Sequence, residues 1–503
     1  MKKKTFLKIS IAVIVALAIL LAMNAQVFAS ITSTTNTSSI YMEGLEEGVT
    51  VTAYQILVVN YDYDADQPKT PMYSWADDAI EDWVEENYED YVDPEDFAGV
   101  TNATTLEAFY SSLAAAIANS EISITAYQTQ TAGEDGTVTF TSVAMGQYLL
   151  ITENGLKVYT PSAVNVVPEY DTESSTWVLD SKYTATVKST TPQITNKISD
   201  ETNATASTVD TISYTVTADV PNYAENSIST TFEITGSLTG LTLDTSSIVV
   251  KGSDGTVLSA GTDYTITTTS TGYTITFDYD KISDYSQVIV TYSATLDNST
   301  LVTGSSNSST ATLTYTNNPY STTSSTQTET ATSTANVYTY GIAVTKLDYE
   351  DKETPLSGAE FTLSDSEGNT LYFVLVNGVY YLSEDSTDST YTSTLTSDST
   401  GTITIKGLDV GKYTLVETKA ADGYNLDSSE ITIELTDEDL DGLLDDNNDD
   451  NGIYELTVYN KTGFTLPTTG GIGTTIFVAI GVVLVVAGLS MIVISSKKKK
   501  NNA

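Results

Sequence analysis

Tyr273-Thr-Ile-Thr-Phe277 carries apolar side chains at every second position, with threonines between them. Tyr214-Thr-Val-Thr-Ala218 repeats this pattern. Because successive side chains of a strand point to opposite faces, such runs predict strands with one buried face and one solvated face. Similar runs, separated by Gly, Asn, Asp and Ser, recur along most of the chain. We therefore expect an all-β protein made of tandem immunoglobulin-like β-sandwich domains.

Compositional breaks divide this β region into three parts. A chain of 503 residues is long enough for about three domains. A Pro-containing linker near Pro192 and a Ser/Thr-rich stretch at 321–336 mark the two divisions, although the second stretch is also compatible with an edge strand. We expect domains at about 31–189, 190–337 and 338–462.

Residues 70–119 depart from the strand pattern. Trp83 to Tyr88 and Leu106 to Asn119 have helical composition. Thr104 and Glu107 fit a capping box at the start of the second helix. We interpret this region as a helical excursion from the first β domain, not as a separate unit.

The N-terminus has the features of a secretion signal. Lys2, Lys3 and Lys4 precede an apolar run at 9–23, and Val27-Phe28-Ala29 follows as a cleavage site that ends in a small residue. This order predicts a signal peptide over residues 1–29. The alternative is a membrane anchor, for which the apolar run is short.

The C-terminal region, residues 466–500, contains three segments in a fixed order. Leu466, Pro467, Thr468, Thr469 and Gly470 come first. An apolar stretch at 472–494, long enough to span a bilayer, and a lysine cluster at 497–500 follow. Together they resemble the cell-wall sorting signal of sortase substrates. The resemblance implies cleavage after Thr469 and transfer of its carbonyl to an amine, with attachment to peptidoglycan. The alternative is a single-pass membrane protein.

The composition excludes several kinds of chemistry. The chain has no Cys, no His and no Arg, and its formal net charge is −45. A Ser-His-Asp triad, a zinc–thiolate site and a disulfide are therefore impossible. Such an acidic chain is not expected to bind nucleic acid. A glycosidase needs only two carboxylates and is not excluded by composition, but we expect a non-enzyme that needs no cofactor.

Three segments of the last domain each place a polar side chain in phase with apolar ones. Lys346 follows Ile342 and Val344 at two-residue spacing. Glu417 follows Tyr413 and Leu415 in the same way, and Asn460 follows Leu456 and Val458. The spacing predicts that a Lys, a Glu and an Asn all point into the core.

Burial gives this trio a possible chemistry. Desolvation lowers the pKa of a buried Lys and raises that of a buried Glu. A neutral amine is a nucleophile, and a protonated Glu417 can donate a hydrogen bond to the Asn460 side-chain carbonyl and make its carbon electrophilic. Attack by Lys346 would release ammonia and leave an isopeptide bond. The alternative is a hydrogen-bonded triad that does not react.

The surrounding motifs resemble the collagen-adhesin B-type domain that ends many Gram-positive pilins. They are Leu356-Ser-Gly-Ala-Glu-Phe361, Gly411-Lys-Tyr-Thr-Leu-Val-Glu417 and Gly423-Tyr424. The resemblance implies that Lys346 and Asn460 form a cross-link and that Glu417 catalyses it. The chain as a whole resembles a sortase-assembled backbone pilin.

The other two domains do not repeat this trio. In the middle domain Asn196 occupies the position of the reactive Lys, and Lys197 is one residue out of phase. Asn317 is in phase for the acceptor role. We expect no bond there unless a β-bulge turns Lys197 inward. In the first domain Glu153 is out of phase, and no lysine lies between the signal peptide and Lys69.

The pilin resemblance also implies a lysine that joins subunits. Lys188 follows a Trp177-bearing strand just before the first linker, and Lys182 is the alternative. We expect Lys188 to lie at one end of the subunit, where Thr469 of the next copy arrives. The alternative is a solvated lysine on a monomeric wall protein.

Asp437, Asp439 and Asp441 match the start of a calcium-binding loop. The twelfth position holds Asn448 in place of the usual Glu. A solvated acidic hairpin loop is therefore the favoured interpretation.

These features predict the structural subunit of a covalently polymerised surface pilus. Its partners would be a class C polymerising sortase, a housekeeping sortase, neighbouring copies joined head to tail, and peptidoglycan. The alternative is a monomeric wall-anchored adhesin that binds a host surface ligand. A wall-anchored enzyme is disfavoured.

Overall fold

The computed structural model describes residues 29–32, 35–223, 227, 229–298, 301–320, 328–384, 390–445 and 451–463, together with Ile480, Leu484 and Val485. Within these residues no helix is long and apolar enough to cross a membrane. The predicted signal peptide up to residue 28, the sorting motif at 466–470 and nearly all of the predicted span at 472–494 lie outside the described residues.

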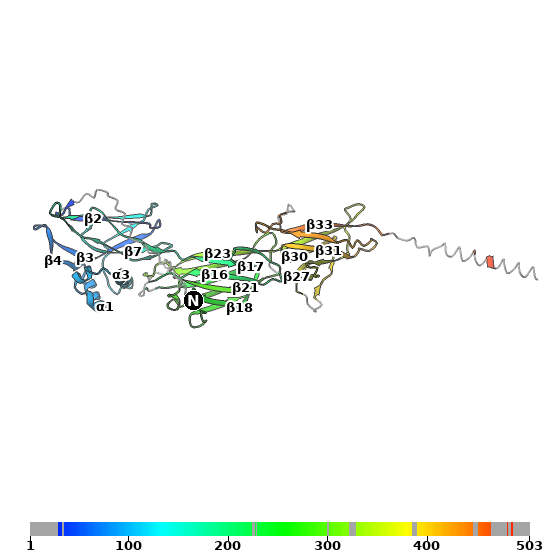
Figure 1. Ribbon diagram of the computed structural model, residues 1–503, viewed down its shortest axis with the longest axis horizontal. Coiled ribbons are helices and arrows are strands. Elements are labelled where there is room, and N and C mark those ends of the chain that lie inside the picture. The colour runs from blue at the N-terminus through cyan, green and yellow to red at the C-terminus, as the bar shows by residue number, and fades with distance from the viewer. Residues whose placement is uncertain are drawn as a thin grey trace, which may run out of the picture.

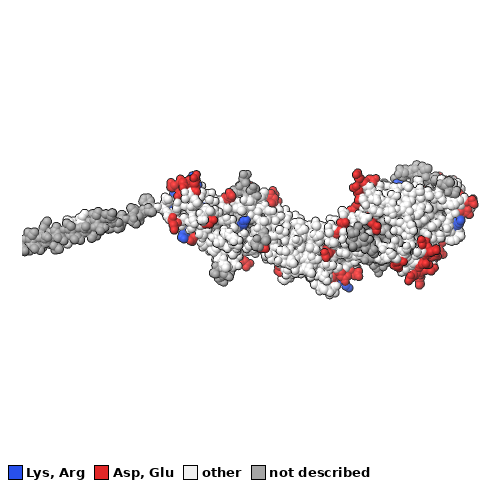
Figure 2. Space-filling model, turned by 180° about the vertical axis from the view of Figure 1, so that it is seen from behind, with Lys and Arg blue, Asp and Glu red and all other residues white. Residues whose placement is uncertain are grey.

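Three β-rich domains follow one another along the long axis of the molecule (Figure 1). Each is organised around its own buried apolar cluster. The expectation of an all-β chain of tandem domains is confirmed. On the face shown in Figure 2, acidic side chains lie near both ends of this rod and in patches between them, and lysines are sparse.

The first domain combines several small sheets. Its strands are β1 (Ala29–Ser30), β2 (Thr37–Glu43), β3 (Thr50–Asp62), β4 (Gln67–Trp75), β5 (Gln128–Thr131), β6 (Thr137–Ala144), β7 (Gly146–Glu153), β8 (Val158–Thr160), β9 (Ser162–Val166), β10 (Glu169–Asp171), β11 (Thr176–Leu179), β12 (Tyr183–Thr184) and β13 (Lys188–Thr190). The largest sheet has the order β4-β3-β7-β9, with β5 also paired to β3, and β12-β2-β6 forms another. The last strand, β13, pairs with β8.

The helical excursion lies between β4 and β5. Its α-helices are α1 (Asp78–Asn87), α2 (Pro94–Ala98) and α3 (Ala103–Ala118). They pack with the outer face of β3 and β7 in a second apolar cluster, which includes Ile56 and Leu149. The predicted capping box is wrong. Asn102 is the N-cap of α3 and accepts a hydrogen bond from the Thr105 N–H at 3.0 Å, because its short amide reaches the first turn from an extended backbone.

The middle domain is a sandwich of two sheets. Its strands are β14 (Ile194–Ile198), β15 (Asn203–Thr205), β16 (Ile212–Asp219), β17 (Phe232–Thr239), β18 (Leu241–Gly252), β19 (Tyr264–Thr269), β20 (Gly272–Phe277), β21 (Gln287–Leu296), β22 (Asn307–Thr316) and β23 (Thr328–Tyr338), with one short helix, α4 (Tyr279–Ile282). The sheets have the orders β14-β16-β21-β18 and β15-β23-β22-β17-β20-β19. The alternating residues of β16 and β20 contribute to the core as expected. The Ser/Thr-rich stretch at 321–336 is strand β23 from Thr328 onward.

The third domain is also a two-sheet sandwich. Its strands are β24 (Tyr340–Asp348), β25 (Glu360–Ser364), β26 (Tyr372–Val376), β27 (Val379–Ser383), β28 (Tyr391–Thr392), β29 (Leu395–Thr396), β30 (Thr402–Leu408), β31 (Gly411–Lys419), β32 (Ile431–Leu435) and β33 (Ile453–Asn460). One sheet has the order β28-β26-β27-β30-β24-β33 and the other β29-β25-β31-β32. The first strand, β24, and the last, β33, are parallel neighbours. β31 belongs to the opposite sheet.

Specific contacts join consecutive domains. Tyr320, which follows β22, is 4% exposed and packs into the helical cluster of the first domain. Tyr315 donates its hydroxyl to the Leu156 carbonyl oxygen at 2.7 Å. At the other junction, Thr208 donates its hydroxyl to the Leu382 carbonyl oxygen at 2.6 Å. The rod therefore has packed junctions between its domains.

Candidate functional site

Three strands of the third domain bring one polar side chain each into its core. Lys346 on β24, Glu417 on β31 and Asn460 on β33 are 0%, 2% and 1% exposed. The burial of β24 and β31 alternates along the strand, so the apolar residues in phase with Lys346 and Glu417 face the same interior. The sandwich places Lys346 and Asn460 in one sheet and Glu417 in the facing sheet.

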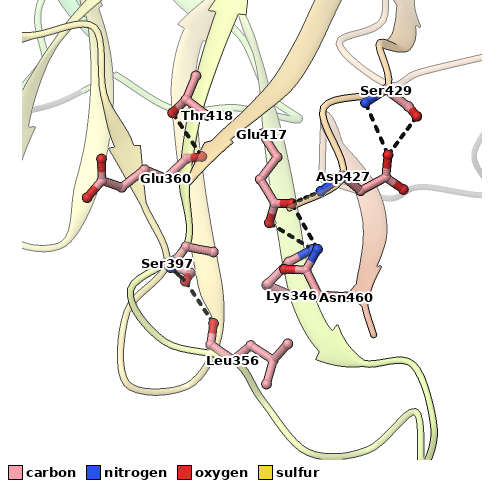
Figure 3. A network of polar contacts seen from close by, with 10 residues as sticks. Lys346, Leu356, Glu360, Ser397, Glu417, Thr418, Asp427, Ser429 and Asn460 are labelled. Carbon is pink, nitrogen blue, oxygen red and sulfur yellow. Dashed lines mark hydrogen bonds and ion pairs between the residues drawn. The ribbon is translucent and has the colours of Figure 1, made fainter. Parts of the chain in front are cut away.

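The Glu417 carboxylate lies between the other two side chains (Figure 3). Its Oε1 is 3.1 Å from the Lys346 Nζ. Its Oε2 accepts hydrogen bonds from the Asn460 Nδ2 at 2.8 Å and from the Asp427 backbone N–H at 2.9 Å. The three residues that the sequence singled out are therefore in direct contact through one carboxylate.

The surroundings of Lys346 make its ammonium form less favourable than it is in water. Burial lowers the pKa of Lys346, and the negative charge of Glu417 opposes part of that shift. The amine also lies 5.6 Å from the centre of the Phe361 ring. Among the described residues the Asn460 Oδ1 accepts no hydrogen bond although it is buried. An amine with a lowered pKa beside an unsatisfied amide is an arrangement suited to acyl transfer, and the unreactive triad is the alternative.

In the middle domain, the buried position on β14 belongs to Asn196, which is 0% exposed. Its Nδ2 donates to the Ser309 carbonyl oxygen at 2.8 Å, and Lys197 is only half-buried on the other side of the strand. Asn317 lies elsewhere, because its Nδ2 donates to the Gly155 carbonyl oxygen of the first domain. Glu153 of the first domain likewise accepts from Asn318 at 3.2 Å. Asn317, Asn318 and Glu153 therefore make contacts across the domain junction, whereas Asn196 bonds within the middle domain. None of them belongs to a Lys–Glu–Asn trio.

Lys188 begins strand β13 and is exposed. Its Nζ lies 2.9 Å from the Glu107 Oε2 of α3, and the two side chains are 54% and 40% exposed. The expectation that Lys188 lies at one end of the molecule is wrong. β13 pairs with β8, and Val158 of β8 packs into the core of the middle domain, so Lys188 lies near the junction of the first two domains. The alternative, Lys182, lies with its Nζ 4.2 Å from the centre of the Tyr41 ring.

The acidic stretch after β32 combines one buried aspartate, Asp437, with two exposed ones, Asp439 and Asp441. Carboxylate oxygens of Asp437, Asp439 and Asp441 lie within 4.8 Å of one another. Asp437 is 7% exposed and accepts hydrogen bonds from the Tyr340 hydroxyl and the Gly442 N–H. The pKa of Asp439 is raised, mainly by the charge of Asp441. The buried Asp437 thus has a structural role, and the twelfth loop position, residue 448, lies outside the described residues.

Two contacts of the candidate residues could not be anticipated from the sequence. Glu107 comes from α3, 81 positions before its partner Lys188. The Asp427 N–H that contacts Glu417 comes from the loop after β31. Neither carries a spacing signal, because both depend on how distant segments pack.

Comparison with known families assigns two parts of the chain. Residues 341–450 match the SpaA family, a prealbumin-like fold domain. Residues 459–502 match the LPXTG cell wall anchor motif. The chain is therefore a cell wall-anchored surface protein whose third domain has a prealbumin-like fold.

Individual relatives cover most of the chain. The trypsin-resistant surface T6 protein of Streptococcus pyogenes serotype M6 is 25% identical over 436 residues, which are 72% of this chain and 81% of that protein. The solved structure of the T6 backbone pilin of serotype M6 Streptococcus pyogenes, described as a modular three-domain structure, covers 81% of each chain with a TM-score of 0.58 and 22% identity. The full-length major pilin SpaD of Corynebacterium diphtheriae covers 85% of this chain and 98% of its own, with a TM-score of 0.47 and 19% identity. The chain is a homologue of the T6 protein and has the three-domain fold of a backbone pilin.

Proposed function

We propose that this chain is the shaft subunit of a covalently polymerised surface pilus, anchored to peptidoglycan by a sortase. The observation that carries the proposal is the combination of the three-domain backbone-pilin fold with an LPXTG anchor in one chain. The acidic, Cys-free composition agrees with a structural protein exposed to water outside the cell.

The buried trio stabilises each subunit by forming an isopeptide bond. A proton passes from the Lys346 ammonium to Glu417, which leaves a neutral amine and a protonated carboxyl. The amine attacks the Asn460 Cγ, the Cγ–Nδ2 bond breaks, and ammonia leaves. A second proton lost by the amine goes to the departing nitrogen, and the product is an amide between Lys346 Nζ and Asn460 Cγ. Glu417 returns to its starting state when it passes the first proton on to the released ammonia.

A flip of the Asn460 side-chain amide prepares the acceptor. In the present arrangement the Asn460 Nδ2 faces Glu417, while Oδ1 accepts no hydrogen bond among the described residues. A half-turn of the amide places Oδ1 beside the Glu417 carboxyl, which can then donate to it and make Cγ electrophilic. A cavity of about 510 Å³, lined by residues that include Asn460 and Asp427, gives ammonia a route toward solvent.

The bond would join the first and last strands of the third domain. β24 and β33 are parallel neighbours, so a pull along the rod enters through one and leaves through the other. A covalent link from Lys346 to Asn460 carries that force past the segment 347–459. By the loop-entropy model such a link is worth roughly 4–5 kcal/mol.

Polymerisation would use Lys188 as the acceptor. Its side chain is 54% exposed, as a sortase substrate requires. A class C polymerising sortase joins the Thr469 carbonyl carbon of one copy to the Lys188 Nζ of the next, head to tail. A housekeeping sortase then transfers the last Thr469 to an amine of the peptidoglycan. Lys182 is the alternative acceptor.

The competing function is a monomeric wall-anchored adhesin that binds a host surface ligand. An immunoblot of cell-wall extracts boiled in SDS separates the two. The shaft function predicts a ladder of high-mass species, because covalent bonds survive boiling. A single wall-linked band at the monomer mass would overturn it and leave the adhesin.

A further inference from the structure

A groove lies beside Lys188 on the first domain. It has a volume of about 270 Å³ and is bounded by α3 on one side and by β9 and the start of β13 on the other. Its apolar lining comes from Leu106, Tyr110, Pro161 and Ala163. Of the described residues that line it, only Glu107 and Lys188 are charged, and they form the 2.9 Å ion pair at its edge.

The ion pair has little value for stability, because both partners are well exposed to solvent. Its geometric effect is larger. Lysine has a long flexible side chain, and a fixed carboxylate restricts where its amine can lie. Glu107 lies near the start of α3, which packs on the sheet, and its carboxylate contacts the Lys188 Nζ at the edge of the apolar groove.

The chain that must approach Lys188 has matching character. Gly463 is the last residue described in the third domain, and Phe464-Thr-Leu-Pro-Thr-Thr469 follows it. These six residues are uncharged and extend up to about 20 Å. If the Thr469 carbonyl is bonded to the Lys188 Nζ, Pro467 and Leu466 must lie within roughly 10 Å of that amine. The apolar lining of the groove lies beside that amine and can contact these two residues.

The geometry points to a binding site: the groove between α3 and β9 receives residues 466–469 of a second copy of this chain, and Glu107 positions Lys188 for the transfer. This inference rests on the proposed role of Lys188. In the transfer, the amine nitrogen bonds to the Thr469 carbonyl carbon as the bond from that carbon to the sortase breaks. The ammonium gives up two protons, one to the leaving group of the sortase and one to water by way of Glu107.

The proposed docking of residues 466–469 is tested by a substitution that fills the groove with a larger side chain. Thr186 also lines the groove and is exposed, so Thr186→Phe adds bulk there without disturbing the core. Thr184→Phe, at an exposed residue two positions earlier that does not line the groove, is the matched control. In cells that produce the full chain and its sortases, Thr186→Phe lowers the high-mass ladder at least about tenfold while wall-anchored monomer persists, since small displacements of reacting groups cost large factors in rate. Thr184→Phe leaves the ladder at the wild-type level.

The positioning role of Glu107 is tested by removing its charge. Glu107→Gln keeps the size of the side chain but removes the carboxylate, so this variant should form the ladder more slowly than the wild-type protein. Glu107→Asp keeps a carboxylate and should form the ladder at a rate between the two. Glu85→Gln, on the exposed face of α1, is the control and changes nothing. Equal melting temperatures of the variants show that a structural defect is not the cause.

The peptide that links two subunits in wild-type polymer is branched, and sequencing it identifies the acceptor lysine. This measurement separates failure of the groove from failure of the proposed role of Lys188. If Thr469 is joined to Lys188 and neither Thr186→Phe nor Glu107→Gln reduces the ladder, the groove is not the docking site, although the pilus assignment stands. If no ladder forms, or if Thr469 is joined to another lysine, the proposed role of Lys188 is wrong. The groove proposal, which rests on that role, is then wrong as well.

Discussion

Glu417 is the residue on which the proposed chemistry of the third domain depends. It contacts the Lys346 amine, the Asn460 amide and the Asp427 N–H at once, and all three side chains of the trio are buried. A buried carboxylate with an ammonium partner is costly unless the pair is well satisfied. The proposed conversion of the Lys and the Asn to a neutral amide would remove the buried charge of Lys346. That loss of a buried charge would favour the reaction.

The first prediction concerns mass. A soluble chain of residues 30–463 should weigh less than its sequence mass by about 17 Da, the mass of one ammonia, because isopeptide formation expels it. Glu417→Ala should restore the full mass, because the proton relay is lost. Intact-mass spectrometry measures both. A folded wild-type protein with its full sequence mass would show that the trio is only a hydrogen-bonded triad.

The second prediction concerns pH. Asn460→Ala removes the acceptor and leaves Lys346 as a free amine in the core. Burial lowers the pKa of Lys346 below its ordinary 10.5 in the folded state, so the unfolded state binds more protons between the two values. The free energy of unfolding of Asn460→Ala should therefore rise with pH in the window that ends near 10.5. The double variant Lys346→Met with Asn460→Ala should lack this rise in urea titrations at several pH values. The same slope in both variants would rule out a lowered pKa at Lys346.

At the scale of elements, the pairing of β24 with β33 would determine how a cross-linked third domain carries a pulling force. The two strands are parallel and adjacent, and the proposed bond lies close to the C-terminal end of each. A domain linked in this way cannot lengthen under tension, because the force bypasses the segment 347–459. A domain without the link must rely on hydrogen bonds alone.

Single-molecule pulling of the three-domain chain provides the third prediction. The wild-type third domain should give no unfolding step. Asn460→Ala should add a step of roughly 40 nm, the extended length of the released segment at about 3.3–3.6 Å per residue. A step of that size in the wild-type protein would contradict the cross-link.

The elements also show where sequence reasoning succeeds and where it stops. The two-residue periodicity of β24, β31 and β33 was sufficient to predict that Lys346, Glu417 and Asn460 face the core, because strand geometry fixes the direction of each side chain. The start of α3 was misplaced because Asn102 and Thr104 are both good capping residues, and only the backbone distinguishes them. The location of Lys188 at a domain junction, and its pairing with Glu107, depend on the docking of β13 and α3, for which no local pattern exists.

At the scale of the whole molecule, the chain is a rod of three packed domains, and the charged side chains on the face in Figure 2 are mostly acidic. Tyr320 and Thr208 hold consecutive domains together at the two junctions. The anchor motif follows the third domain, and Lys188 lies near the first junction. A head-to-tail polymer would therefore bring the end of one third domain to the junction of the first two domains of the next subunit.

The fourth prediction concerns anchoring. Thr469 is the residue whose carbonyl the sortase is proposed to transfer, so Thr469→Ala or deletion of residues 466–470 should leave the protein in the membrane or the medium. Fractionation of cells followed by immunoblotting measures this. Normal attachment of these variants to the wall would exclude the sortase route.

The most direct test of the shaft function is the identity of the bond between subunits. Polymer released from the wall and boiled in SDS should contain a branched peptide in which the Thr469 carbonyl is joined to the Lys188 Nζ. Lys188→Ala should abolish the ladder and leave folded, wall-anchored monomer. Lys188→Arg should also form no ladder, because a guanidinium stays charged and cannot act as the nucleophile. A branch at Lys182 would support the shaft function but show that Lys182, and not Lys188, is the acceptor. The absence of any ladder from wild-type cells would contradict the shaft function itself.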